Sequence, residues 1–196
     1  MGEISARNFG LLIAYLIPGF TALCGAGVFS PAVHAWLAGP PGPSVGGFLY
    51  VTVGSVAAGM TVSAVRWALV DSLHAVTGLR RPAWDDSKLD VKLPAFEYIV
   101  DNHYRYYQFY ANSFVALLFS YVAWRVSAAG GTVAARWLDA GVMFVESVFL
   151  AGSRDALRNY YRRTSNLLGT KESEESDDQR QSSPDGRGGV DDDEEQ

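Results

Sequence analysis

The sequence has no charged side chain over a stretch of 58 positions, residues 8–65. A water-soluble domain needs polar faces on its helices and strands, and so long an uncharged stretch leaves too few of them. This absence argues against an ordinary soluble domain and indicates that this part of the chain lies in a membrane. The overall composition, 48% hydrophobic and 19% charged, hides the pattern because the charges gather elsewhere.

Cysteine and lysine are also scarce. The single cysteine, Cys24, excludes a disulfide within the chain and a metal site built from several thiolates. The sequence contains only 3 lysines beside 13 arginines, a bias that suggests a GC-rich prokaryotic genome.

Basic residues form no single stripe, so nucleic acid is not an expected partner. Phosphate-binding, zinc-helix and nucleophile-elbow motifs are absent, which disfavours an enzyme without excluding one whose residues are scattered, and we expect no metal or cofactor.

Four segments can cross a bilayer, which requires about 20 mostly apolar residues in a helix. Proline and glycine between positions 40 and 47 separate the first two segments. A signal peptide is the alternative for the first segment, although its apolar run is long and only Arg7 precedes it as a basic residue. The expected spans are residues 9–29, 48–67, 106–124 and 137–151. Residues 1–169 are therefore predicted to form one all-α domain, a four-helix membrane bundle.

The placement of arginine and lysine predicts the orientation of these spans. Thirteen of the 16 basic residues fall in the N-terminal segment, the loop 68–105 and the C-terminal segment, and a fourteenth, Arg66, lies at the end of the second span that adjoins this loop. Cytoplasmic loops accumulate such residues, so both termini are expected in the cytoplasm and the protein in the cell membrane.

Three of the helices are expected to continue beyond the membrane as a short cytoplasmic stalk. The second span runs on without a break to Gly78, a C-terminal capping residue. Pro94 can begin the helix that leads into the third span, and the fourth helix continues to about Leu168. After the stalk, residues 170–196 contain 11 of the 21 acidic residues and are predicted to be a disordered tail.

Glu146 is the most informative ionisable residue because it lies near the middle of the fourth span. Inserting a charged side chain at the middle of a membrane helix costs about 2.5 to 3.5 kcal/mol, so such a residue is expected to have a structural or functional role. Asp139 lies seven residues earlier, on nearly the same helix face, and the pair is a candidate ion or proton pathway. The structural alternative hydrogen-bonds Glu146 to Ser113 or Ser120 and pairs Asp139 with Arg136.

Two further patterns concern packing and lipid. Small residues recur at four-residue spacing in the second span and predict close helix packing: Ser55, Gly59 and Ser63. Arginines after the fourth span form a basic ring that can attract lipid headgroups: Arg154, Arg158, Arg162 and Arg163.

The stalk contains two groups of candidate residues. Mixed charge around one tryptophan resembles a contact loop, and the candidate interaction residues are Trp84, Asp85, Asp86 and His103. The alternative is that Trp84 simply covers the helix ends. Carboxylates and histidines on the two stalk helices could serve an enzyme at the lipid interface: Asp71, His74, Asp101 and His103. Asp101 and His103 lie about 200° apart around their helix, which argues against a shared metal ion.

These observations support three functional hypotheses. The first is a non-enzymatic assembly or interaction subunit that contacts a cytoplasmic protein partner through its stalk and tail. The second is an oligomer that conducts ions or protons through Glu146, which includes effectors that permeabilise membranes. The third is an enzyme at the lipid interface. The first and second both allow a homo-oligomer in the lipid bilayer.

Overall fold

The computed structural model describes residues 2–38, 45–127 and 133–169, and in these ranges it consists of helices with no strand. This confirms the all-α prediction. The acidic tail, residues 170–196, lies outside the described residues. The helices are α1 (Gly2–Gly27), α2 (Pro31–Ala38), α3 (Val45–Arg66), α4 (Ser72–Val76), α5 (Leu89–Ile99), α6 (Arg105–Ser127) and α7 (Val133–Leu168).

Two π-helical turns join these helices into longer ones. The turn η1 (Trp67–Asp71) connects α3 to α4, and η3 (Val100–Tyr104) connects α5 to α6. The first composite helix ends where expected, because Gly78 adopts φ +89°. The second begins earlier than expected. A 3-10 turn, η2 (Asp86–Lys88), starts it at Leu89, so Pro94 lies inside α5.

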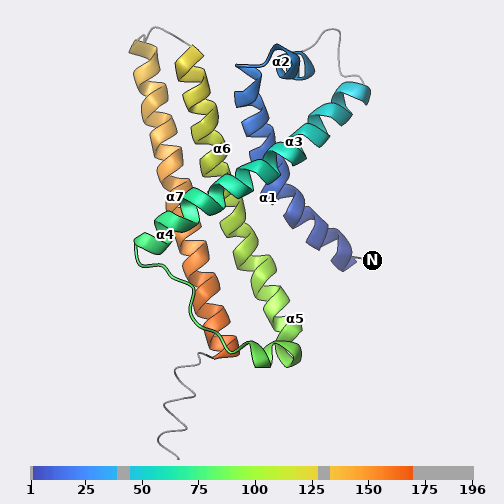
Figure 1. Cartoon of the computed structure of the whole chain (residues 1–196), viewed down its shortest axis with the longest axis vertical. Coiled ribbons are helices and arrows are strands. Elements are labelled where there is room, and N and C mark those ends of the chain that lie inside the picture. Colours follow the sequence, from blue (N-terminus) through green and yellow to red (C-terminus); the bar gives the residue numbers. More distant parts are fainter. Residues whose placement is uncertain (1, 39–44, 128–132, 170–196) are drawn as a thin grey trace, which may run out of the picture.

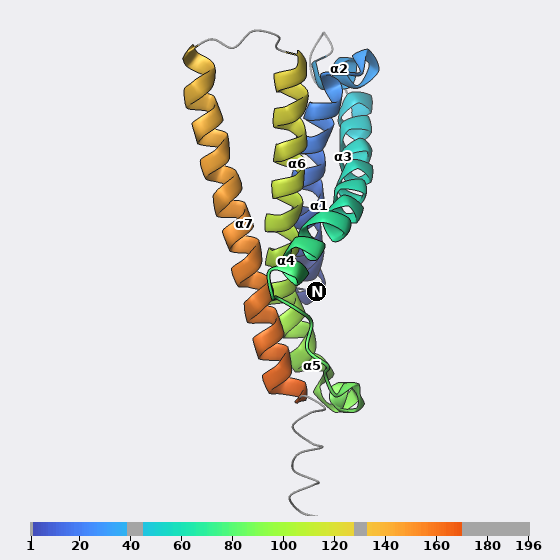
Figure 2. The same ribbon diagram turned by 60° about the vertical axis from the view of Figure 1, so that its left-hand side comes forward.

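Four long helices alternate in direction (Figure 1). α1 packs between α3, which runs antiparallel to it, and α6, which runs parallel. α7 packs against α6 and is 36 residues long, about 54 Å at the usual helical rise. Figure 2 shows that α6 and α7 lie close together near the C-terminal end of α7 and diverge toward its N-terminal end.

The crossing of α1 and α3 is unusually close because glycine lies on both helices. A Cβ placed on Gly19 would lie 1.8 Å from the carbonyl oxygen of Ser55, and one on Gly59 would lie 2.2 Å from that of Tyr15. Ser55 and Gly59, two of the three small residues expected at a packing face, are buried in this crossing. The third, Ser63, is half-buried one turn further along α3.

α6 is hydrogen-bonded to α1 at the point where Pro18 interrupts the hydrogen bonds of the α1 backbone. Pro18 has no N–H, so the carbonyl of Ala14, four residues earlier, has no proline donor within the helix. The Nδ2 atom of Asn112, on α6, donates to this carbonyl at 2.9 Å, and Asn112 is 0% exposed. A second bond runs from the Ser120 hydroxyl to the carbonyl of Thr21 at 2.7 Å.

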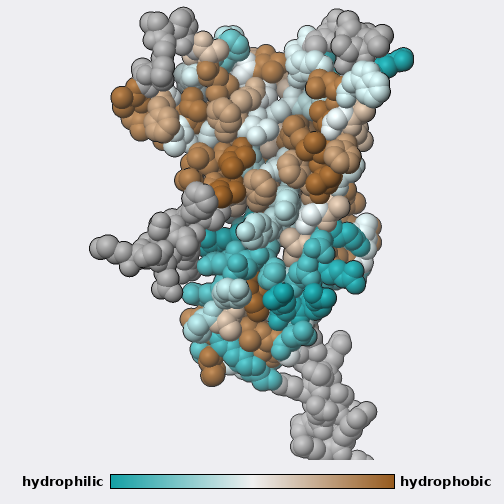
Figure 3. Space-filling view, turned by 180° about the vertical axis from the view of Figure 1, so that it is seen from behind, coloured by the Kyte–Doolittle hydropathy of each residue, from teal (hydrophilic) through white to brown (hydrophobic). Residues whose placement is uncertain are grey.

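Apolar and polar surfaces are segregated along the molecule. Figure 3 shows apolar side chains gathered over one half and hydrophilic side chains over the other. Large exposed hydrophobic residues occur on α1, α3, α6 and α7. Within the described ranges one helix, Val45–Val76, is long and apolar enough to cross a membrane, and Leu12–Gly27 forms a shorter apolar helix.

Candidate functional site

Four polar residues of α7 recur every seven positions: Asp139, Glu146, Ser153 and Tyr160. Seven residues make almost two helical turns, so these side chains share one face and follow each other at about 10.5 Å. This face is turned inward, since Asp139 contacts α6, Ser153 contacts α4, and Tyr160 packs on Trp84. We call the four residues the α7 polar row.

The first member of the row, Asp139, is bound to α6. The Tyr121 hydroxyl donates to its carboxylate at 2.7 Å, and Arg125 forms an ion pair with it at 3.5 Å. Within the described residues, these partners therefore come from the neighbouring helix rather than from Arg136 on the same helix.

The second member, Glu146, is 5% exposed, and neither of its carboxylate oxygens has a hydrogen-bond partner among the described residues. The contacts on either side of Glu146 show which part of α6 lies opposite it. Asp139 accepts a hydrogen bond from Tyr121, and the ring of Phe149 lies 6.4 Å from that of Tyr110. Antiparallel packing between these points places Glu146 opposite the α6 turn that contains Ser113.

The hydroxyl of Ser113 is also buried, and the described residues offer it no hydrogen-bond partner. Ser120, the other serine expected to bind Glu146, donates to α1 instead. Ser113 lies seven residues before Ser120 and so shares the face of α6 that contacts α1. Neither of the two expected serine partners therefore binds Glu146 among the described residues.

The third member, Ser153, leads to a histidine. Its hydroxyl lies 3.1 Å from Nε2 of His74, and both residues are buried. The ring of His74 packs beside Tyr107 at 6.2 Å between centroids. The α7 polar row thus reaches α4 and the polar end of the bundle.

Beyond His74 lies a network that the π-turn η1 creates. In a regular α-helix, side chains five residues apart point in different directions, whereas a π-turn aligns them because it bonds residue i to residue i+5. Arg66 and Asp71 therefore meet in an ion pair of 3.1 Å. The Tyr107 hydroxyl donates to the same carboxylate, and the Arg66 guanidinium lies 5.1 Å above the Tyr107 ring.

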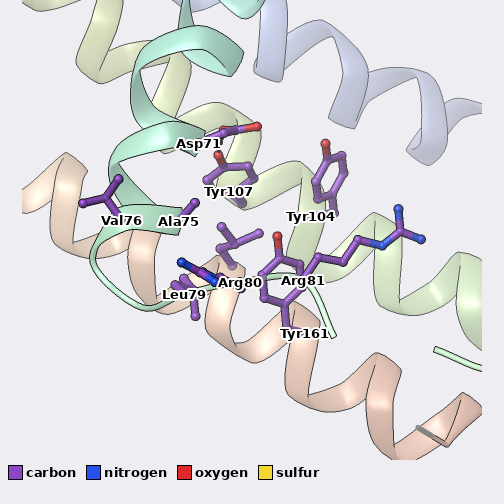
Figure 4. Close-up of a pocket in the computed structure, with 10 residues that line it drawn as sticks. Asp71, Ala75, Val76, Leu79, Arg80, Arg81, Tyr104, Tyr107 and Tyr161 are labelled. Atoms are coloured by element: carbon purple, nitrogen blue, oxygen red, sulfur yellow. Dashed lines mark hydrogen bonds between the residues drawn. The ribbon is translucent and has the colours of Figure 1, made fainter. Parts of the chain in front are cut away.

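A cavity of about 480 Å³ opens beside this network, between α4, α6, α7 and the segment after Gly78 (Figure 4). Asp71 and Tyr104, the last residues of the two π-turns, both line it. π-turns occur often at functional sites. Their position here makes the cavity a second feature of the candidate site.

The contact loop expected around Trp84 is folded onto α7. Trp84 is 6% exposed, packs edge-on against Tyr160 and Tyr161, and donates from its indole nitrogen to Ser165 at 3.1 Å. The backbone N–H of Asp85 donates to Gly169 at 3.4 Å. Trp84 thus covers the end of α7, and within this loop the exposed interaction candidate is Asp86.

Asp85 caps the turn that starts α5. Its carboxylate accepts from the Ser87 N–H at 3.0 Å and from the Ser87 hydroxyl at 2.6 Å, and it lies 3.2 Å from Lys88 Nζ. These hydrogen bonds, with a smaller contribution from Lys88, lower the pKa of Asp85 below its usual value of 3.8.

We expect acid to release this cap. A carboxyl whose pKa is lowered by folding stabilises the fold above its unfolded pKa, and the contribution disappears as the pH falls through the folded value. Amide exchange at Ser87, corrected for its intrinsic rate, should therefore accelerate below about pH 4. Asp85→Asn retains an acceptor oxygen but cannot titrate, so its corrected exchange should be independent of pH. Equal pH dependence in both proteins would contradict this role.

The remaining stalk candidates do not converge on one ion. Asp71 pairs with Arg66, Asp101 forms an ion pair with Arg105 at 2.8 Å, and His74 binds Ser153. Burial, followed by the charge of Arg163, lowers the pKa of half-buried His103. In the ranges that the structure describes, no group of three histidine, cysteine or acidic side chains could hold a metal ion.

The basic ring expected after residues 137–151 is divided among different roles. Arg154 donates to the carbonyl of Thr77 at 2.9 Å and so caps the end of α4. Arg162 donates to Asn159 at 2.8 Å, and Arg158 and Arg163 are exposed.

Comparison with protein-family models, curated proteins and solved structures finds no match to this chain. The function must therefore be inferred from the geometry. Three residues of the site went unnoticed in the sequence: Ser153, Arg66 and Tyr107. The seven-residue spacing from Asp139 through Glu146 could have revealed Ser153, whereas a π-turn leaves no comparable pattern for the other two.

Proposed function

We propose that the chain is a four-span membrane protein that transfers protons along the α7 polar row. The observation that carries the proposal is Glu146, a buried carboxylic acid with no hydrogen-bond partner among the described residues. An unpaired carboxyl in an apolar environment favours its neutral, protonated form. It can release and regain a proton, which is what a relay in a membrane requires.

Several observations support four spans with both termini in the cytoplasm. The four long helices alternate in direction, and each exposes large hydrophobic side chains. The stretch 8–65, which contains most of α1 and α3, has no charged residue. Hydrophilic side chains gather over one half of the molecule (Figure 3), which cytoplasmic placement of that half would explain.

The row supplies the successive steps of a relay. Asp139 lies at one end of the interface, and Glu146 follows about 10.5 Å along α7. The Ser153 hydroxyl donates to the carbonyl of Leu150 at 2.8 Å and accepts from Nε2 of His74, so passing a proton to His74 would require this hydroxyl to turn from Leu150 toward Nε2. Water between Glu146 and Ser153 would bridge the remaining distance. Beyond His74, Asp71 and Tyr107 line the cavity through which the proton would leave.

Proton flux into liposomes tests this proposal directly. A potassium gradient with valinomycin would set the voltage, and a trapped pH indicator would report the flux. Glu146→Gln preserves size and polarity but cannot release a proton, so we expect flux at the background level. Ser147→Ala is the matched control because Ser147 is exposed on the same helix, and its flux should equal that of the natural protein.

Two results would overturn the proposal. One is a folded natural protein without flux across a range of pH and voltage. The other is a Glu146→Gln variant that conducts as well as the natural protein. Circular dichroism and elution volume in detergent would show that each variant is folded.

An assembly subunit is the second candidate, and one observation favours it. The stalk helix α5 exposes Val91 (86%) and Tyr98, seven residues apart on one face and away from the apolar half of the molecule. A cytoplasmic protein with an apolar surface would fit this face. The flux measurement separates the two candidates, since an assembly subunit alone conducts no protons.

A further inference from the structure

The cavity at the polar end of the bundle has walls of three chemical kinds. Its floor is apolar, formed by side chains of α4, the following loop and α7. Tyr104, Tyr107 and Tyr161 provide aromatic walls, while Arg80 and Arg81 provide positive charge. The hydroxyl ends of Tyr104 and Tyr161 point toward the side where Asp71 lies (Figure 4). Its volume of about 480 Å³ is within the range of ligand sites.

The charge available to a ligand in this cavity is positive. The only carboxylate among the lining residues, that of Asp71, is already bound by Arg66 and by the Tyr107 hydroxyl. Arg81 lies 4.7 Å above the Trp84 ring. Among the residues that the structure describes, no carboxylate lies within ion-pair distance of Arg80 or Arg81.

The cavity also borders the apolar surface of the molecule. Val76, one of its lining residues, is 84% exposed. Further back along the same composite helix, Trp67, Leu69 and Leu73 are exposed as well. A ligand that enters here would therefore meet positive charge within the cavity and an apolar surface beyond Val76.

We propose that this cavity binds the headgroup of an anionic phospholipid. Arg80 would bind the phosphate, because a guanidinium group matches phosphate oxygens in geometry and charge. Arg81, whose guanidinium points the opposite way in Figure 4, would add positive charge on the far side of the cavity. The tyrosine hydroxyls would donate to the remaining headgroup oxygens. An acyl chain would leave over Val76 and lie along the apolar face of η1 and α4. The inference rests on the membrane location proposed above, but it does not depend on proton transfer.

This site differs from the basic ring that the sequence suggests. Arg154 is committed to the end of α4, and Arg158 and Arg162 lie on α7 but are not among the residues that line the cavity. The two sites can therefore be tested against each other with variants that remove equal charge.

Native mass spectrometry of the full chain in detergent measures the binding. We expect phosphatidylglycerol to bind at least ten-fold more tightly than phosphatidylcholine. The double variant Arg80→Gln/Arg81→Gln should lose this preference, whereas Arg158→Gln/Arg162→Gln should keep it. Ala75→Trp retains every charge but fills the cavity, and it should weaken phosphatidylglycerol binding to a similar extent.

The other outcomes would overturn the proposal. Loss of binding in Arg158→Gln/Arg162→Gln alone would assign the lipid to the basic ring. Unchanged binding in Ala75→Trp would place the lipid outside the cavity. Displacement of the lipid by millimolar inorganic phosphate would identify a soluble phosphate as the ligand. Resistance of the protein to extraction by alkaline carbonate, measured separately, distinguishes failure of this site from failure of the membrane assignment.

Discussion

Replacing Gly59 by alanine should force α1 and α3 apart. The new Cβ would lie 2.2 Å from the carbonyl oxygen of Tyr15 and 2.9 Å from its carbonyl carbon. Both atoms belong to the backbone, so no rotation of a side chain relieves the clash. We expect a loss of about 3 kcal/mol in the free energy of unfolding, the upper end of the usual range for overpacking. Thermal unfolding in detergent, followed by circular dichroism, measures it.

Gly54→Ala is the matched control for this experiment. Gly54 lies on the same helix, but its added Cβ would meet only the side chain of Leu23, at an ordinary distance of 3.4 Å. Its effect should be small and favourable or neutral, since alanine is the better helix former. Equal unfolding temperatures for Gly54→Ala and Gly59→Ala would show that the helices do not cross this closely.

The helical framework could be predicted because it depends on local patterns. The expected segments 9–29, 48–67, 106–124 and 137–151 lie mainly in helical parts of the chain. Apolar length and the absence of charge indicate such helices without knowledge of their neighbours. The short helix α2 (Pro31–Ala38) escaped notice because the whole connection was interpreted as a turn rich in proline and glycine.

The candidate site could be predicted only in part. Glu146 stood out because an acidic residue in an apolar helix is conspicuous, whereas Ser153 resembles any small packing residue. Trp84 resembled a contact residue because the end of α7, which buries it, lies some eighty positions away. The cavity combines residues from several elements that lie far apart in the sequence, so no local pattern reveals it.

The hydrogen bond from Asn112 to the backbone of α1 should stabilise the fold, because Pro18 leaves the accepting carbonyl without a donor in its own helix. Asn112→Leu removes the hydrogen-bond donor of the Ala14 carbonyl. Pro18 has no N–H that could replace this donor, so the carbonyl is left buried without a partner. We expect this to cost about 1–2 kcal/mol, the usual penalty for a buried polar group that loses its hydrogen-bond partner. In a Pro18→Ala background, the restored N–H of residue 18 can bond to Ala14, so the same substitution should cost much less.

A double-mutant cycle isolates this effect. Pro18 is itself buried, so Pro18→Ala leaves a cavity. This cavity is present with either Asn or Leu at position 112, so its free-energy cost cancels in the cycle. We expect a coupling of about 1 kcal/mol between positions 18 and 112. The control is Gln108→Leu, which breaks another bond from α6 to α1, donated to the Tyr15 hydroxyl at 3.2 Å. That bond does not involve the freed carbonyl, so its loss should cost the same with Pro18 or Ala at position 18. Purely additive effects at positions 18 and 112 would mean that Asn112 does not compensate for the proline.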